Sequence, residues 1–130
     1  MSASISAKRN YVPFVVEGDL LHISGQISRH NGRDDEGAQA ARQSALGVVA
    51  QIVAATGDRL DRVARVVRLN VFIASTPAFS AQSVIANGAS DVIVQIFGEA
   101  GRHARSAVGV ASLPAGVAVE VEAVIALKNT

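Results

Sequence analysis

The run VAVEVEAVIAL, residues 117–127, alternates residues of opposite character and so limits how the chain can fold. In a β-strand, residues two apart point to the same side. The first three valines of the run therefore share one apolar side, whereas Glu120 and Glu122 share the other. This pattern predicts a strand in a sheet that has one face covered by apolar packing.

Four further segments predict strands, because they are rich in β-branched residues or are bounded by turn residues. Residues 11–27 predict a hairpin that turns at Glu17-Gly18-Asp19. Residues 62–75 predict a long strand whose apolar side is formed by Val63, Val67, Leu69, Val71 and Ile73, with Arg68, Asn70 and Phe72 on the other side. Residues 105–112 predict a strand that forms a second hairpin with the last one, through Leu-Pro-Ala-Gly at 113–116.

Two segments have the three-and-four spacing of apolar residues that is typical of helices. Residues 35–56 predict a helix that ends at Gly57. The pair Thr76-Pro77 predicts the start of a second helix, which ends before Gly98. The apolar face expected for this second helix is Ile85, Val92, Ile93, Ile96 and Phe97. The polar segment 28–37 predicts a loop.

The order strand, strand, helix, strand, helix, strand, strand predicts a single α+β domain over residues 1–130, with two helices on one face of a mixed, mainly antiparallel sheet. Strand parity leaves small and charged residues for the second face, namely Arg68, Asn70, Phe72, Arg105, Ala107, Gly109, Ala111, Glu120, Glu122, Val124 and Ala126. A face open to water carries longer polar side chains along its whole length. We therefore expect this face to bind other copies of the chain.

Composition excludes several classes of function. The net charge of +1 comes from interspersed basic and acidic residues, so a nucleic-acid partner is not expected. The chain has no cysteine, and hence no thiolate nucleophile and no cysteine-ligated metal. The start MSASISAKRN has no apolar stretch that could serve as a signal peptide, and no run of apolar residues is long enough to span a membrane. We expect a soluble, cytoplasmic protein.

Three motifs in fixed order resemble the RidA/YjgF family, which is also called the L-PSP family. They are HISGQI at 22–27, VVRLNVFIAS at 66–75, and ARSAVGVASLPAGVAVEVEAV at 104–124. The segment that contains HARSAVGV resembles a particular branch of that family. The resemblance implies a chorismate-mutase-like fold, a homotrimer built around a central barrel, and ligand sites in the clefts between subunits.

The resemblance also implies an activity, the hydrolysis of reactive 2-imino or enamine acids to 2-oxo acids and ammonia. Arg105 is expected to bind the substrate carboxylate, and Glu120, with the backbone around Ser24 and Gly25, to place the attacking water. Tyr11 and Asn87 are expected to border the same cleft. Such a reaction needs a site that fixes the carboxylate, excludes bulk solvent and orients one water, and a guanidinium suits the first task because it matches a carboxylate in two parallel hydrogen bonds. No metal and no organic cofactor are therefore expected.

Departures from the family pattern leave the preferred substrate open. Ala107 stands where the family often has cysteine, and Arg102 and His103 replace prolines. His103, in a loop, is interpreted as solvated rather than as a general base. Arg105 could instead form an ion pair with Glu120 or Glu122. Two other functions therefore remain, a non-catalytic trimer that binds a small carboxylate or a protein partner, and an endoribonuclease, which the scarcity of Lys and aromatic residues disfavours.

Overall fold

The structure, a computed structural model, describes residues 10–29 and 37–129. Its strands are β1 Phe14–Glu17, β2 Leu20–Ile27, β3 Val63–Ala74, β4 Ala104–Val110 and β5 Val119–Leu127. Its α-helices are α2 Gly37–Thr56 and α3 Gln82–Phe97, and its short 3-10 turns are η1 Leu60–Arg62, η2 Gly98–Gly101 and η3 Pro114–Gly116. The predicted loop at 28–37 and the predicted first two residues of α2 lie largely outside the described residues.

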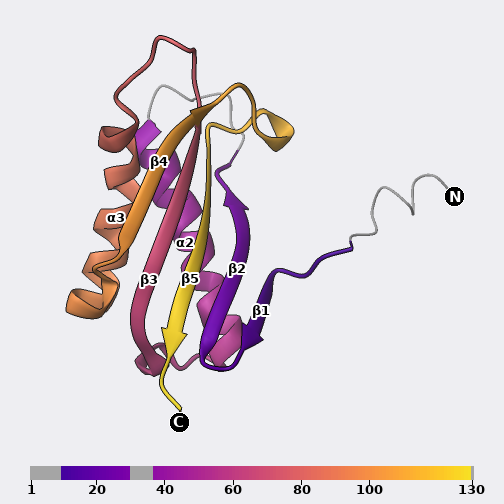
Figure 1. Ribbon diagram of the computed structural model, residues 1–130, viewed down its shortest axis with the longest axis vertical. Coiled ribbons are helices and arrows are strands. Elements are labelled where there is room, and N and C mark those ends of the chain that lie inside the picture. The colour runs from indigo at the N-terminus through magenta and orange to yellow at the C-terminus, as the bar shows by residue number, and fades with distance from the viewer. Residues whose placement is uncertain (1–9, 30–36, 130) are drawn as a thin grey trace, which may run out of the picture.

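The five strands form one sheet in the order β1-β2-β5-β3-β4. Figure 1 shows this order from right to left, with both helices packed on the far face of the sheet. The pair β3 and β4 is parallel and the other three pairs are antiparallel. The fold is therefore the predicted α+β arrangement, a mixed and mainly antiparallel sheet with two helices on one side.

The predicted second hairpin is wrong. β4 pairs with β3, whereas β5 lies two strands away, between β2 and β3. The physical reason is that α3 connects β3 to β4, and a strand that returns after a helical crossover lies parallel to the first one. The apolar alternation of β5 also suits a central position, where every second side chain is buried. The turn at 113–116 carries the chain from the sheet edge to its middle.

The predicted parity of β3 is wrong at one position. Val66 is fully buried, whereas Val67 is 37% exposed. The register against β5 shifts by one residue between Val66 and Arg68, so Val67 is the extra residue of a β-bulge. Leu69, Val71 and Ile73 are buried as predicted, because the extra residue brings these odd-numbered side chains onto the same face as Val66.

Helix α2 ends as predicted, since Gly57 follows it with a φ of 64°. Helix α3 begins at Gln82 rather than at Thr76, because residues 76–79 form a turn in which the Phe79 amide bonds the Thr76 carbonyl. Its buried residues are Ala86, Ala89, Val92 and Ile93, whereas Ile96 is 40% exposed and Ile85 and Phe97 are partly buried. Small residues therefore let the helices approach each other closely. A Cβ at Gly88 would lie 2.7 Å from the carbonyl carbon of Ala38.

A hydrophobic core fills the space between the helices and the sheet. Its largest fully buried side chains are Leu21, Ile52, Leu69, Ile93 and Ile125. The opposite sheet face has no covering element among the described residues (Figure 1). It carries Arg68, Asn70, Phe72, Ser106, Val108, Glu120, Glu122, Val124 and Ala126, most of which are partly exposed.

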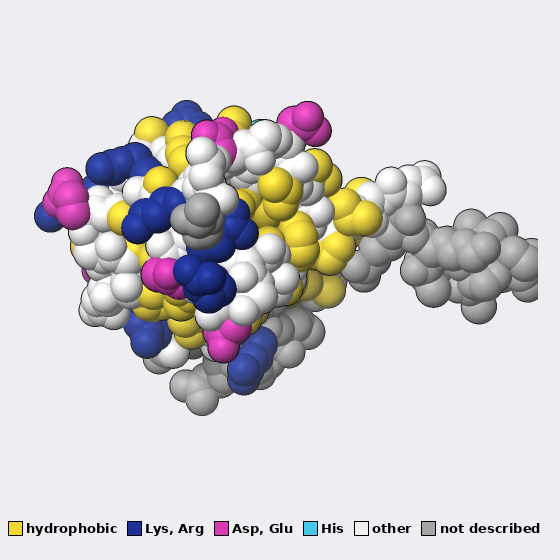
Figure 2. Space-filling view, turned by 90° about the horizontal axis from the view of Figure 1, so that it is seen from below, with side chains coloured by type: hydrophobic (Ala, Val, Ile, Leu, Met, Phe, Trp, Pro, Cys, Tyr) yellow, Lys and Arg dark blue, Asp and Glu magenta, His cyan; other side chains and the backbone are white. Residues whose placement is uncertain are grey.

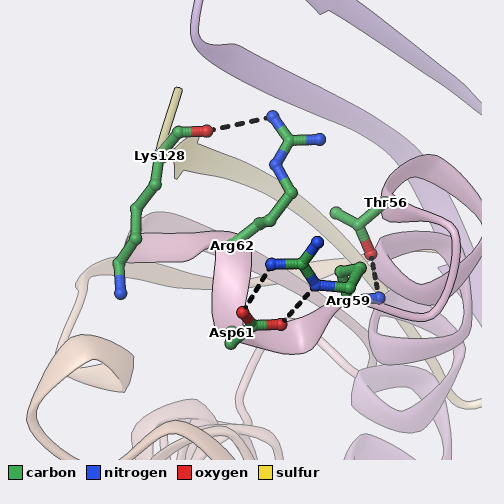
Figure 3. A network of polar contacts seen from close by, with 5 residues as sticks. All are labelled: Thr56, Arg59, Asp61, Arg62 and Lys128. Carbon is green, nitrogen blue, oxygen red and sulfur yellow. Dashed lines mark hydrogen bonds and ion pairs between the residues drawn. The ribbon is translucent and has the colours of Figure 1, made fainter. Parts of the chain in front are cut away.

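Polar contacts hold the lower end of the molecule, where α2 leads into β3 (Figure 3). The Thr56 hydroxyl accepts a hydrogen bond from the Arg59 amide, and Arg62 donates one to the Lys128 carbonyl at 3.0 Å. Arg59 binds Asp61 through two hydrogen bonds, which lower the pKa of that exposed carboxyl. Figure 2 shows this end, with Lys and Arg side chains near its centre and a hydrophobic area on the side of β1 and β2.

Candidate functional site

Four of the six predicted site residues line one cavity of about 500 Å³. These are Tyr11, Ser24, Gly25 and Glu120. Gln26, Gln51 and Pro114 contribute to the same wall. Residues from the start of the chain, from β2 and from β5 therefore meet in space, although about 95 residues separate Gly25 from Glu120 along the chain.

A β-bulge shapes the β2 wall of this cavity. The register between β2 and β5 shifts by one residue between Ile23 and Gln26, so Ser24 and Gly25 occupy the irregular step. The Ser24 hydroxyl donates to the Val12 carbonyl at 2.8 Å, and the Ser24 amide donates to the Pro13 carbonyl at 2.9 Å. Ser24 therefore ties the segment that carries Tyr11 to the sheet, a positioning task rather than a nucleophilic one.

Glu120 points from β5 toward the bulge. A Cβ at Gly25 would lie 2.7 Å from the carboxyl carbon of Glu120, closer than real Cβ atoms approach another heavy atom. Only glycine leaves room for the carboxylate at that place. Glu120 itself is partly buried and contributes to the cavity wall.

The other two predicted residues, Asn87 and Arg105, line a different cavity of about 610 Å³ between α3 and the start of β4. Ser90, Asp91, Arg102 and His103 are among its other lining residues. The six residues therefore do not form one site within a single chain. They form two groups, one around Glu120 and one around Arg105.

The predicted orientation of β4 is wrong, and this moves Arg105 to the helix side of the sheet. In the parallel pairing of β3 and β4, Arg105 stands beside Leu69 and Ala107 beside Val71, both of which are buried core residues. Ser106 and Val108 face the uncovered side instead, and Arg68 bonds the Ser106 hydroxyl at 3.1 Å. The prediction failed because it assigned parity without the register that the helical crossover imposes.

Arg105 is bound only by neutral groups. Its Nη1 donates to Asn87 Oδ1 at 2.9 Å and to Ser90 Oγ at 3.1 Å, and its Nη2 donates to the Ser83 carbonyl at 3.4 Å. No carboxylate of a described residue lies within 4.0 Å of its guanidinium. Glu122 instead accepts a hydrogen bond from Asn70 at 2.9 Å, on the other face. The alternative ion pair of Arg105 with Glu120 or Glu122 is therefore not formed within one chain.

The contact between Ser90 and His103 was not predicted from the sequence. Ser90 Oγ lies 2.8 Å from His103 Nε2, and His103 Nδ1 lies 2.6 Å from the Gly101 carbonyl oxygen. The interpretation of His103 as a solvated loop residue is therefore wrong, because both ring nitrogens have protein partners. The two residues lie in a helix and in a loop, so no periodic spacing connects them.

Two classes of site are absent from the part of the chain that the structure describes. No group of three or more His, Cys, Asp or Glu side chains is placed to hold a metal ion. No helix in the same ranges is long and apolar enough to cross a membrane.

Comparison with known proteins gives matches over nearly the whole chain. A family model described as Endoribonuclease L-PSP matches residues 1–127. Protein TCP17 of Trypanosoma cruzi is 51% identical over an alignment of 142 positions, which covers 99% of this chain and 88% of that protein. The structure of Atu1372 from Agrobacterium tumefaciens, a protein described as of unknown function, superposes with a TM-score of 0.85 at 41% identity and covers 92% of this chain and 82% of that one. The YjgF gene product of E. coli superposes with a TM-score of 0.64 at 30% identity, covering 89% and 87%.

Proposed function

The chain belongs to the Endoribonuclease L-PSP family, which includes YjgF-type proteins, and from this we propose that it hydrolyses 2-imino and enamine acids to 2-oxo acids and ammonia. The observation that carries the proposal is Arg105. Arg105 is a half-buried residue on the wall of a cavity of about 610 Å³, and its guanidinium has only neutral partners among the described residues. A cation with unused donors in such a place favours an anionic ligand, and its planar fork suits a carboxylate.

In the proposed mechanism, three copies of the chain pack through their uncovered sheet faces. The cavity that contains Arg105 of one subunit then meets the cavity that contains Glu120 of the next. This arrangement unites the two groups of residues that a single chain keeps apart. It also accounts for the apolar members of the uncovered face, such as Phe72 and Val124, which would be poorly placed against water.

The proposed reaction needs orientation and a relay of protons. Arg105 holds the carboxylate of the protonated imino acid, and water adds to the imine carbon while Glu120 accepts a proton from that water. Glu120 then returns this proton to the nitrogen of the carbinolamine. The bond between carbon and nitrogen breaks, the hydroxyl group added by water becomes the 2-oxo group, and its proton passes to the departing ammonia. Ammonia leaves, and an enamine substrate first gains a proton on carbon to become the imine.

Enzymatically generated 2-aminoacrylate tests the proposal directly. The wild-type protein is expected to release ammonia faster than buffer does, and Arg105→Ala is expected to match buffer. Binding of a 2-oxo acid without faster ammonia release would overturn the catalytic proposal. It would instead indicate a module that binds small carboxylates.

The family description also names an endoribonuclease, and the cavity around Arg105 gives that activity less support. Arg102 is the second cation of its lining, and none of the lining residues is Phe, Tyr or Trp. Single-stranded RNA is usually held by clustered cations and by aromatic side chains on which bases stack. Degradation of single-stranded RNA by nuclease-free protein, lost in Arg105→Ala, would reverse this ranking.

A further inference from the structure

We propose that Ser90 and His103 are positioning residues, which together hold the Arg105 guanidinium so that one fixed edge of it faces the substrate carboxylate. The inference rests on the proposed function in one respect, namely that Arg105 binds a carboxylate. Neither residue needs to touch the substrate. They act through Arg105.

The direction of each hydrogen bond in this group follows from chemistry. A carbonyl oxygen only accepts, so His103 must carry its proton on Nδ1, 2.6 Å from the Gly101 carbonyl. In the neutral ring, Nε2 is then the acceptor, and it receives the Ser90 hydroxyl proton over 2.8 Å. The Ser90 oxygen consequently presents a lone pair to Arg105 Nη1, 3.1 Å away.

These bonds decide which part of Arg105 remains available. Nη1 has two N–H groups, and Asn87 and Ser90 accept one each. Nε has no hydrogen bond to any described residue, and Nη2 makes only the long contact to the Ser83 carbonyl. The side of the guanidinium formed by Nε and Nη2 is therefore left for a ligand. Two parallel N–H groups on that side match the two oxygens of a carboxylate.

The turn that anchors the group packs closely against α3. Gly101 is buried against α3, where a Cβ would lie 2.6 Å from the Ile93 carbonyl oxygen and 3.1 Å from the Val94 Cα. Any larger residue would displace the η2 turn. The Gly101 carbonyl, and with it the His103 ring, is therefore fixed relative to the helix that carries Ser90 and Asn87.

A double-mutant cycle tests the inference, with 2-oxobutyrate as the probe and its dissociation constant measured by calorimetry. Ser90→Ala and His103→Ala are each expected to weaken binding about tenfold, as loss of one bond to a charged group does. The double variant is expected to lose no more than either single one, because the two residues act as one unit. His103→Gln is expected to restore affinity, since its amide oxygen can accept the Ser90 hydroxyl. Ser83→Ala is the matched control, since Ser83 contacts Arg105 only through its carbonyl, and it is expected to bind like wild type.

Losses that add in the double variant, or unchanged affinity in both single variants, would overturn the inference. If wild-type protein fails to bind 2-oxobutyrate, the proposed function fails, and nuclear magnetic resonance of the ligand-free protein decides the inference alone. We expect the His103 ring in its Nδ1–H form at neutral pH. We also expect the Arg105 guanidinium to rotate slowly in the wild-type protein and in Ser83→Ala, and faster in Ser90→Ala and His103→Ala. The Nε2–H form, or rotation that is equally fast in all four proteins, would contradict it.

Discussion

The carboxylate of Glu120 lies against the backbone of Gly25, in space that a Cβ on that glycine would need. Gly25 occupies the irregular step of β2, and its φ is not positive, so alanine is compatible with the backbone there. The constraint on this glycine is therefore the neighbouring carboxylate rather than backbone strain.

Gly25→Ala is accordingly expected to displace Glu120 while the fold is kept. Deamination of 2-aminoacrylate should fall by about a hundredfold, which is the scale of an error of about 1 Å in the placement of a reacting group. Ammonia release measures the effect, and Glu120→Gln should show a loss of similar size. Full activity in Gly25→Ala would mean that the position of the carboxylate does not matter to the reaction.

Arg105→Lys is expected to fail nearly as badly as Arg105→Ala. Lysine keeps the charge but loses the two-pronged geometry. Both variants should lose roughly 2 to 4 kcal/mol of binding free energy for pyruvate or 2-oxobutyrate, the range for removal of a charge-assisted pair from a partly desolvated site. Calorimetric titration decides it, with Arg59→Lys on the exposed surface as the control that should bind normally. Unchanged affinity in Arg105→Ala would exclude this arginine as the carboxylate anchor.

The uncovered sheet face is expected to form a homotrimer. Light scattering at micromolar concentration should give three times the 13.4 kDa of one chain. Val124→Lys places a charge in the middle of that face and should dissociate the assembly, because a buried unpaired charge is costly. Leu46 of α2 is 42% exposed, and Leu46→Lys should leave the assembly intact. A wild-type mass of one chain would remove the shared cleft from the proposed mechanism.

The bulge in β3 predicts opposite behaviour for two adjacent valines. Val66→Ala removes a fully buried side chain and should lower the free energy of unfolding by about 2 kcal/mol. Val67 is 37% exposed, and Val67→Ala should cost less than about 0.5 kcal/mol. Urea denaturation of the two variants measures both values, and equal losses would contradict the register shift between Val66 and Arg68.

The ion pair of Arg59 and Asp61 makes the free energy of unfolding depend on pH, with a sign that follows from the pKa shift. Hydrogen bonds from Arg59 lower the pKa of the Asp61 carboxyl in the folded protein. A lowered pKa means that the pair stabilises the fold at neutral pH and loses this effect as pH falls through the folded pKa, below the ordinary aspartate value. Titration of the Asp61 carboxyl by nuclear magnetic resonance should show the lowered value, and Arg59→Gln or high salt should raise it again. Because both side chains are exposed, the effect on stability should be small.

The sequence allowed us to predict which segments form the helical layer and which form the sheet, but it predicted the order of the strands in the sheet only partly. Alternation in residues 117–127 correctly assigned the buried valines of β5, since period-two patterns follow directly from strand geometry. The place of β4 depended on the crossover through α3. Recognition of residues 63–110 as a strand, helix and parallel strand would have placed Arg105 on the helix side.

The candidate site shows a different limit. Family motifs named Tyr11, Ser24, Gly25 and Glu120, and these residues do line one cavity. They could not reveal that Arg105 and Asn87 lie in another, because motif order carries no distances. The contact between Ser90 and His103 could not be foreseen, because a helix residue and a loop residue come together only through tertiary packing.

The separation of Arg105 from Glu120 has a genetic consequence if neighbouring subunits complete each other's clefts. An allele that lacks the arginine and an allele that lacks the glutamate would each be inactive alone, yet chains from both could assemble together. In such a mixed ring, one cleft can receive its arginine from one parent and its glutamate from the other. With equal amounts of the two chains and random assembly, roughly a quarter of the clefts would be intact. Two copies in one cell, each with one of the defects, would therefore restore part of the activity that neither provides alone. A chain that carries both defects could not restore activity in this way with either of them.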